Sequence, residues 1–282
     1  MKYRPLVLFF ALAFLLPWAV WGTQIAQDAG WSSWHVPGSL AFWIGLTVAT
    51  FGCAAAVGRW PAVKDLLVRM VRGRVALRWY VVAVLLTPAL ALLATGAARL
   101  AGTTAAVGVE VPPSALPLLL VVNMWLFLLT EETAWRGFAL PRLQLMMSPL
   151  SAALVLGIIW GLWHVPLFLV AGSFQSTIPF GGFMISIVAT SVVVSWIFNH
   201  TRGSVLLAAL FHACTDVTIA FMGVMSNSTI SFWTFVALQC VVAGALAPSL
   251  RRLPENSYGL VLNLQADGEG DRGTQGFRRQ PA

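Results

Sequence analysis

Long apolar runs are the feature that most limits what this chain can fold into. A helix needs about 20 apolar residues to cross a bilayer, and the sequence offers eight such segments, at about 6–22, 39–58, 79–97, 116–138, 149–171, 181–199, 203–222 and 230–248. Only 10% of the 282 residues are charged and 59% are hydrophobic, whereas a soluble domain carries about 25% charged residues. We therefore predict an all-α membrane protein, a polytopic bundle of about eight transmembrane helices.

The basic residues alternate along the chain in step with these spans. If the N-terminus is cytoplasmic, 16 of the 17 Lys and Arg residues fall in cytoplasmic segments, and only Arg99 falls outside. Because this distribution follows the positive-inside rule, we predict a multi-pass protein of the cell membrane with both termini in the cytoplasm. Topology then explains the formal charge of +7, so we expect the lipid bilayer, and no nucleic acid, as a partner.

Two segments outside the spans have a distinctive composition. Residues 60–78 mix basic and apolar residues at helical spacing, which predicts either an amphipathic interfacial helix on the inner leaflet or a plain basic loop that fixes topology. From Pro254 onward the sequence turns polar, which is typical of a disordered tail. We therefore divide the chain into a transmembrane domain at 1–252 and a cytoplasmic tail at 253–282.

A few ionisable residues lie within the predicted spans, where they are costly and therefore functional candidates. Six of them remain on spans four, five and seven once the loops and the tail are set aside: Glu131, Glu132, Arg136, His164, His212 and Asp216. A buried ion pair, or a histidine that merely bonds a neighbouring helix, is the structural alternative for each one alone. The gathering of Glu, His and Asp on three helices favours a site.

Helical spacing predicts different roles for the two adjacent glutamates. Glu132 and Arg136 are four residues apart and can pair along one helix face, which we interpret as a structural ion pair. Glu131 points about 100° away from Glu132, because a helix has about 3.6 residues per turn. It therefore stays free for chemistry.

The two histidines also have neighbours at helical spacing. Trp160 precedes His164 by four residues, so the indole can pack against the imidazole or fix its orientation. Pro166 should kink the helix beside His164, because proline cannot donate a backbone hydrogen bond. His212 and Asp216 have the same four-residue spacing, and a carboxylate there could orient the histidine.

Together these groups suit the hydrolysis of an amide by an activated water. A glutamate and a histidine can share a water and remove its proton as it attacks a carbonyl, and a second histidine with a polar neighbour can donate to the oxyanion. The common zinc-protease sequence HExxH does not occur. We predict no metal and no cofactor, with zinc held by two histidines and a carboxylate as a lesser alternative.

Three motifs give this pattern a resemblance to a known family. Residues 131–137 (EETAWRG) match EExxxR, residues 160–164 (WGLWH) match FxxxH with Trp in place of Phe, and residues 212–216 (HACTD) match HxxxN/D. In this order on separate helices, they resemble the CAAX protease and bacteriocin-processing (CPBP, or ABI) family of glutamate intramembrane endopeptidases, which includes the type II CAAX prenyl endopeptidases. The resemblance covers about residues 120–222.

The resemblance implies a role for each matched residue. Glu131 and His164 would activate the water, and His212 and Asp216 would form the oxyanion side. The other matched residues would support the site: Glu132, Arg136 and Trp160. The prenyl endopeptidases carry Asn at the last position, and an ionised Asp cannot donate a hydrogen bond as an amide does. Asp216 is therefore either protonated or a group that orients His212.

We accordingly expect a metal-independent endopeptidase that cuts near the cytoplasmic face. An apolar cavity open to the inner leaflet would hold a membrane-embedded or lipidated peptide or protein substrate. Two other classes of function stay open. A transporter or proton relay also uses Glu and His within the membrane and would depend on a pH gradient. A non-catalytic scaffold or bacteriocin-immunity protein would act by binding, and would keep its function after Glu131→Ala.

Overall fold

The computed structural model describes residues 4–34, 36–103 and 111–254. Within these ranges the secondary structure is helical and contains no strand. The α-helices are α1 (Arg4–Asp28), α2 (Val48–Met70), α3 (Leu77–Leu100), α4 (Leu116–Leu129), α5 (Leu140–Gln144), α6 (Pro149–Trp163), α7 (Phe180–His200), α8 (Val205–Met222) and α9 (Thr229–Leu246). Two π-helical segments, η1 (Ala41–Thr47) and η3 (Thr133–Ala139), precede α2 and α5. The tail predicted at 253–282 lies almost wholly outside the described residues.

The predicted all-α membrane architecture is confirmed. Among the described residues, seven helical stretches are long and apolar enough to cross a membrane, and α6 is a shorter apolar helix of 15 residues. Helix α6 ends at Trp163, and the chain continues as the 3₁₀ turn η4 (Val165–Phe168). Because Pro166 has no N–H to donate, the predicted kink is instead a helix end, and His164 is its C-terminal cap.

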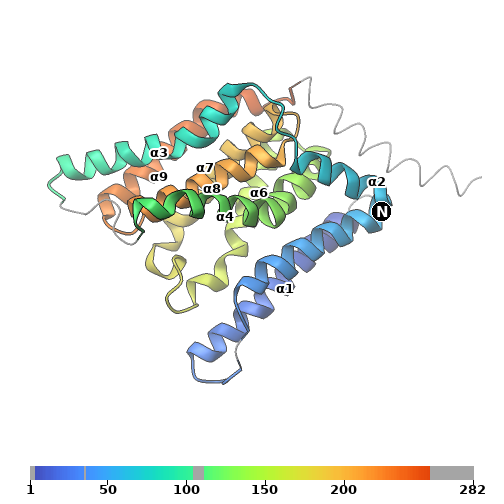
Figure 1. Ribbon diagram of the computed structural model, residues 1–282, viewed down its shortest axis with the longest axis horizontal. Coiled ribbons are helices and arrows are strands. Elements are labelled where there is room, and N and C mark those ends of the chain that lie inside the picture. Colours follow the sequence, from blue (N-terminus) through green and yellow to red (C-terminus); the bar gives the residue numbers. More distant parts are fainter. Residues whose placement is uncertain (1–3, 35, 104–110, 255–282) are drawn as a thin grey trace, which may run out of the picture.

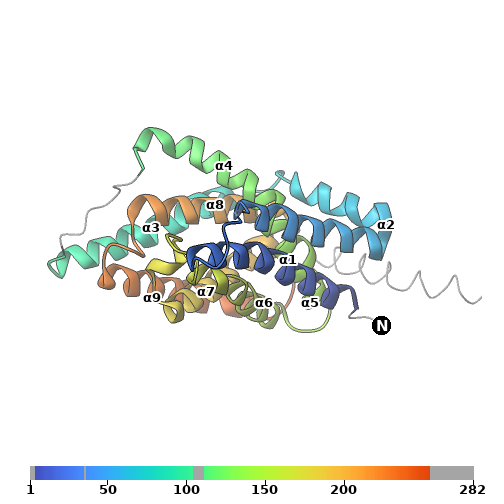
Figure 2. The same cartoon turned by 90° about the horizontal axis from the view of Figure 1, so that it is seen from below.

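The helices run back and forth between two ends of the bundle (Figure 1). One end, which we call the basic end, carries the start of α1, the end of α2 and the connections at 71–76, 145–148 and 201–204. The opposite end carries the connections at 29–40, 169–179 and 223–228. Helix α3 packs on α8 and α9, α4 packs on α8, and α6 packs on α7. Figure 2 shows α4 on one side of this layer and α1 paired with α2.

Two tryptophans attach α1 to the end of α6. The Trp163 indole N–H donates to the Ala13 carbonyl at 2.8 Å, and the Trp18 indole N–H donates to the Trp163 carbonyl at 3.0 Å. Both bonds join the residue directly before His164 to a neighbouring helix. They therefore fix the position at which α6 ends.

Two glycines on α6 allow a close approach to α7. A Cβ on Gly157 would lie 2.9 Å from the Cα of Val188, and a Cβ on Gly161 would lie 2.5 Å from the Met184 sulfur. Small residues four apart let two membrane helices approach closely. This contact places α6, and with it His164, directly against α7.

The segment at 60–78, predicted as either an amphipathic interfacial helix or a plain basic loop, is partly each. Helix α2 continues through it after a break at Gly58 and Arg59, and ends at Met70. Residues 71–76 are not helical, so the predicted helix is right for little more than half of its length. Its Leu66 and Arg69 are buried, because this part of α2 packs against η3 and turns that face toward protein.

Candidate active site

A cavity of about 560 Å³ lies among α4, α6, α7 and α8. Its lining includes all four residues that the sequence suggests as catalytic: Glu131, His164, His212 and Asp216. Its volume falls within the range of about 300–1,000 Å³ that is typical of ligand sites. The structure thus brings three motifs that are far apart in the sequence to one cavity wall.

The two adjacent glutamates have different partners. Helix α4 ends at Leu129 and is followed by Thr130, whose backbone (φ −118°, ψ −90°) is not helical; η3 begins at Thr133. Glu131 accepts a hydrogen bond through Oε2 from the Trp160 indole at 2.7 Å. Glu132 accepts one through Oε1 from Arg136 at 2.9 Å, and both of these side chains are fully buried. The predicted Glu132–Arg136 ion pair is therefore confirmed.

Trp160 connects several parts of the site. Its indole donates to Glu131, its ring lies 4.3 Å below the Arg136 guanidinium carbon, and its backbone carbonyl lies 2.8 Å from His164 Nδ1. The indole and imidazole centroids are 6.1 Å apart. The carbonyl of Trp160 therefore orients His164, while the indole, which was expected either to pack against the imidazole or to fix its orientation, lies near that ring and donates to Glu131.

The hydrogen bond between His164 Nδ1 and the Trp160 carbonyl also determines which ring nitrogen of His164 can act as a base. A carbonyl only accepts, so Nδ1 carries the proton, and a neutral ring keeps its lone pair on Nε2. Trp163 meets this imidazole edge-on at 4.8 Å and Phe183 at 5.2 Å. These two rings limit the rotation of His164.

His212 is held by Glu132 rather than by the residue that its spacing suggested. Its Nδ1 lies 2.8 Å from Glu132 Oε1, and its Nε2 lies 3.7 Å from Asp216 Oδ1. The second distance is too long for a hydrogen bond. Phe127 stacks on the imidazole at 3.7 Å, and Trp160 meets it edge-on at 5.1 Å. Glu132 and two aromatic rings therefore hold His212, while Asp216 lies within ion-pair distance of its other ring nitrogen.

Asp216 is the most open member of the set. Its side chain is 48% exposed and lines the cavity one helical turn beyond His212. The adjacent Thr215 is tied to α3 by a hydroxyl pair with Thr87 at 2.8 Å, which secures the backbone at this point. The carboxylate of Asp216 is therefore available to a molecule in the cavity.

Comparison with known proteins supports the resemblance seen in the motifs. Residues 113–218 match the family described as type II CAAX prenyl endopeptidase Rce1-like. This segment is Rce1-like. It is 32% identical over 106 residues to the CAAX prenyl protease 2 of Methanococcus maripaludis, an alignment that covers 36% of this chain and 39% of that relative. The Rce1-like segment holds every catalytic candidate, so the family resemblance predicted from the sequence is confirmed.

Arg69 is a site residue that sequence reasoning did not single out, and it lies outside the Rce1-like segment. Its guanidinium donates to the Gly137 carbonyl at 2.8 Å and to the Asp65 carboxylate at 2.9 Å. Gly137 belongs to η3, the segment that directly follows both glutamates. The sequence did offer one signal for Arg69. Asp65 lies four residues before it, in a stretch whose other charged residues are basic, and this spacing indicates an ion pair.

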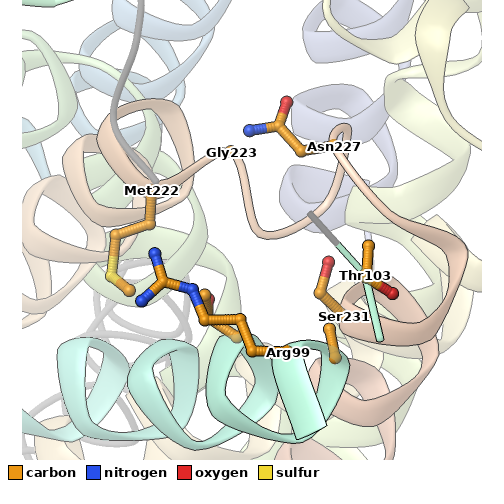
Figure 3. Close-up of a pocket in the computed structure, with 8 residues that line it drawn as sticks. Arg99, Thr103, Met222, Gly223, Asn227 and Ser231 are labelled. Atoms are coloured by element: carbon orange, nitrogen blue, oxygen red, sulfur yellow. The ribbon is translucent and has the colours of Figure 1, made fainter. Parts of the chain in front are cut away.

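Figure 3 shows a second and much smaller pocket, outside the Rce1-like segment. It has a volume of about 10 Å³ near the opposite end, and its lining includes Arg99, Met222, Asn227 and Ser231. Space of this size holds about one water molecule. None of its lining residues is Glu, Asp, His or Cys, so it offers no group for hydrolysis.

The zinc alternative depends on ligands that lie close together. Among the described residues, no group of three or more His, Cys, Asp or Glu side chains has a geometry that could hold a metal ion. The acidic and imidazole groups of the Rce1-like segment are instead paired with Trp160, Arg136 and one another.

Proposed function

We propose that this chain is an intramembrane endopeptidase of the CAAX protease type, and that Glu131 and His164 activate the attacking water. One observation carries the proposal: the Glu, His and Asp residues of three separate motifs line a single cavity. The Rce1-like match over the same residues supports it. A scaffold would not require these groups to face one space.

Glu131 and His164 supply the base. Trp160 occupies Oε2 of Glu131, so Oε1 can accept a hydrogen bond from a water. His164 offers the lone pair on Nε2, because Nδ1 is bonded to a carbonyl. The water oxygen attacks the peptide carbonyl carbon while its proton passes to this base. The same proton then moves to the leaving amine as the C–N bond breaks.

His212 stabilises the oxyanion that forms on the peptide carbonyl. With Glu132 at Nδ1 and Asp216 beyond Nε2, the ring can hold a proton on both nitrogens, and Nε2 then donates to the developing charge. The buried Arg136 balances Glu132. Asp216 lies within ion-pair distance of Nε2 and lines the cavity, where its carboxylate can also contact the bound peptide.

The apolar walls of the cavity suit a membrane-embedded or lipidated peptide. Apolar side chains, most often phenylalanine and leucine, make up most of its lining, and burial of such surface contributes about 25 cal/mol for each Å². The distribution of basic residues supports a place in the cell membrane with the N-terminus in the cytoplasm. The relative in Methanococcus maripaludis is named as a prenyl protease, and a prenylated peptide is one member of this substrate class.

A survey of peptide termini tests the proposal. Membranes are taken from cells that lack the protein and are complemented with wild type, Glu131→Gln or Asp28→Asn at matched levels. Asp28 is exposed and accepts a hydrogen bond from the Ala171 N–H, a bond that Asn can keep, so this variant is a control for the same change of charge. New termini should appear with wild type and Asp28→Asn alone.

The same survey separates the rival functions. If Glu131→Gln gives the same termini as wild type, the proposal that this site hydrolyses peptide bonds is wrong. If a wild-type phenotype also persists in Glu131→Gln, the function is binding. Dependence of the phenotype on a pH gradient, without new termini, would favour transport.

A further inference from the structure

Two hydroxyls on one face of α7 belong to the wall of the cavity. Ser186 and Thr190 are among its lining residues, and both side chains are buried. They are four residues apart, so they lie on the same face of the helix, about 6 Å from each other along its axis. Phe183, one turn before Ser186, meets the His164 imidazole at 5.2 Å between ring centroids. The two hydroxyls therefore continue the helix face that contacts His164.

A single glutamine on α9 bonds both hydroxyls. The Ser186 hydroxyl donates to Gln239 Oε1 at 2.7 Å, and Gln239 Nε2 donates to Thr190 Oγ1 at 3.2 Å. The shorter distance is typical of an O–H donor, and the longer one is within the range of an N–H donor. Gln239 is buried and lies beyond residue 218, where the Rce1-like segment ends. The family match therefore does not describe this contact.

These bonds give the two hydroxyls opposite roles toward the cavity. Gln239 engages the proton of Ser186, so the oxygen of Ser186 can only accept a further hydrogen bond. Thr190 accepts from Gln239, so its own O–H can still donate. Within the described residues, neither hydroxyl has another hydrogen-bond partner. The wall therefore presents one acceptor and one donor, in a fixed order along α7.

This order matches the main chain of an extended peptide. One edge of such a peptide presents N–H and C=O groups, and the pattern repeats every two residues, which is about 6.6 Å at about 3.3 Å per residue. The two hydroxyls are separated by about 6 Å along α7, which is close to this repeat. An extended peptide that lies along α7 can therefore bond both of them.

We infer that Ser186 and Thr190 bind the main chain of the substrate peptide beside the catalytic groups. Ser186 accepts from one peptide N–H, and Thr190 donates to a peptide C=O on the same edge. Gln239 is a positioning residue, because it is not among the described lining residues and acts through the two hydroxyls. The inference rests on the proposed function and adds that the peptide is held in an extended form, by its backbone, along this wall.

A purely structural role is the alternative, because Ser, Thr and Gln side chains also bond neighbouring helices within membranes. Ser191 has such a role on the same helix. It is fully buried, it donates to the Ala153 carbonyl of α6 at 2.9 Å, and it is not among the described lining residues. Ser186 and Thr190 differ from it because they line the cavity. Ser191→Ala is therefore the matched control.

A binding experiment with N-methylated peptides tests the inference. The full chain carries Glu131→Gln, so that the peptide is not cleaved, and is purified in detergent. The probe is the apolar peptide acetyl-Leu-Ala-Phe-Leu-Ala-Leu-amide, together with a set of forms that each carry one N-methyl group. Each methyl group removes one N–H donor and leaves the side chains unchanged. The Kd of every peptide is measured by calorimetry.

We expect methylation at one position to raise the Kd by about three- to tenfold, because the bond to Ser186 is lost. In Ser186→Ala the same methylation should have almost no effect, whereas Ser191→Ala should keep the full effect. Thr190→Val should weaken the parent peptide by a similar factor and keep the effect of methylation. Gln239→Met should at least halve that effect, since the Ser186 hydroxyl can then turn away.

Three results would overturn the inference. One is a parent peptide that does not bind, and another is a Kd that no methylation changes. The third is a methylation effect that is equal with and without Ser186. An unchanged effect in Gln239→Met would overturn the role given to Gln239. Ser186→Ala and Thr190→Val add no volume to the core, so a Tm near that of Ser191→Ala should show that these variants are folded.

The binding experiment requires no catalysis, so the two proposals fail in different ways. A methylation effect that does not depend on Ser186, together with termini that depend on Glu131, overturns the backbone contact and leaves the proposed function standing. Termini that do not depend on Glu131 overturn the proposed function whatever the peptides show.

Discussion

The substitution Trp160→Phe isolates the hydrogen bond that holds Glu131 in the site. The indole N–H donates to Glu131 Oε2 at 2.7 Å, while the ring packs against Arg136 and the edge of His212. A phenyl ring keeps an aromatic surface at this position but has no N–H. Because the family motif itself carries Phe here, the fold should accept the change.

The expected loss of activity follows from the strength of that bond. A hydrogen bond to a charged group contributes about 1.5–3 kcal/mol, and about 1.36 kcal/mol corresponds to a tenfold change in rate. We therefore expect kcat/KM to fall by about 10- to 150-fold. The fall should lie in kcat rather than in KM, because Glu131 acts on the water and not on substrate binding. The assay is steady-state cleavage, by purified protein, of a peptide identified in the terminus survey.

Trp163→Phe is the matched control. It removes an equally buried indole N–H, which donates to the Ala13 carbonyl at 2.8 Å, but it does not change the contact to Glu131. Both variants should lose thermal stability to a similar degree, while Trp160→Phe loses far more activity. Activity of Trp160→Phe within twofold of wild type, or equal losses in both variants, would refute the reasoning.

Other substitutions test the remaining contacts. Glu132→Gln leaves the fully buried Arg136 without a counter-charge, so the free energy of unfolding should fall by about 3–5 kcal/mol; an unchanged Tm in detergent would contradict this. Arg69→Met removes the bond to η3 and should lower Tm and activity together, whereas the exposed Arg252→Met should lower neither. Asp216→Asn should keep the wild-type Tm, because its half-exposed carboxylate makes no hydrogen bond to the histidine. A chelator should leave cleavage unchanged, and near-stoichiometric zinc with chelator-sensitive activity would contradict the metal-independent mechanism.

The architecture and the members of the site could be predicted because membranes restrict both. A span must be long and apolar, so seven of the eight predicted segments are recognised by length and composition alone. An ionisable side chain in a membrane must face protein or a cavity, so the conspicuous Glu, His and Asp residues gather in one place. Helix α6 is shorter than predicted, because its apolar run continues past Pro166 after the helix has ended.

The partners within the site could not be predicted in the same way. Spacing along a helix reports neighbours on that helix alone, and it correctly paired Glu132 with Arg136. It also suggested Asp216 for His212, but the packing of α4 on α8 brings Glu132 to 2.8 Å from that ring. The indole N–H of Trp160 finds Glu131 on another helix, and such a contact depends on tertiary packing.

Residues 60–70 show a related limit. An amphipathic pattern states that one face of a helix is apolar, but a membrane surface and a protein surface bury that face equally well. Arg69 was therefore assigned to topology together with the other basic residues. Its burial depends on Asp65 and on a carbonyl of η3, neither of which the apolar pattern describes.

This second half of α2 holds the segment that directly follows the two glutamates. Arg69 holds η3 through the Gly137 carbonyl, and Leu66 fills the space beside that glycine. Leu66, Arg69 and Gly137 do not line the cavity, so this part of α2 fixes the segment that carries Arg136 from outside the cavity. The Glu132–Arg136 pair is fully buried, whereas Glu131 is among the residues that line the cavity. The structural charges are thereby kept apart from the carboxylate that we propose to be reactive.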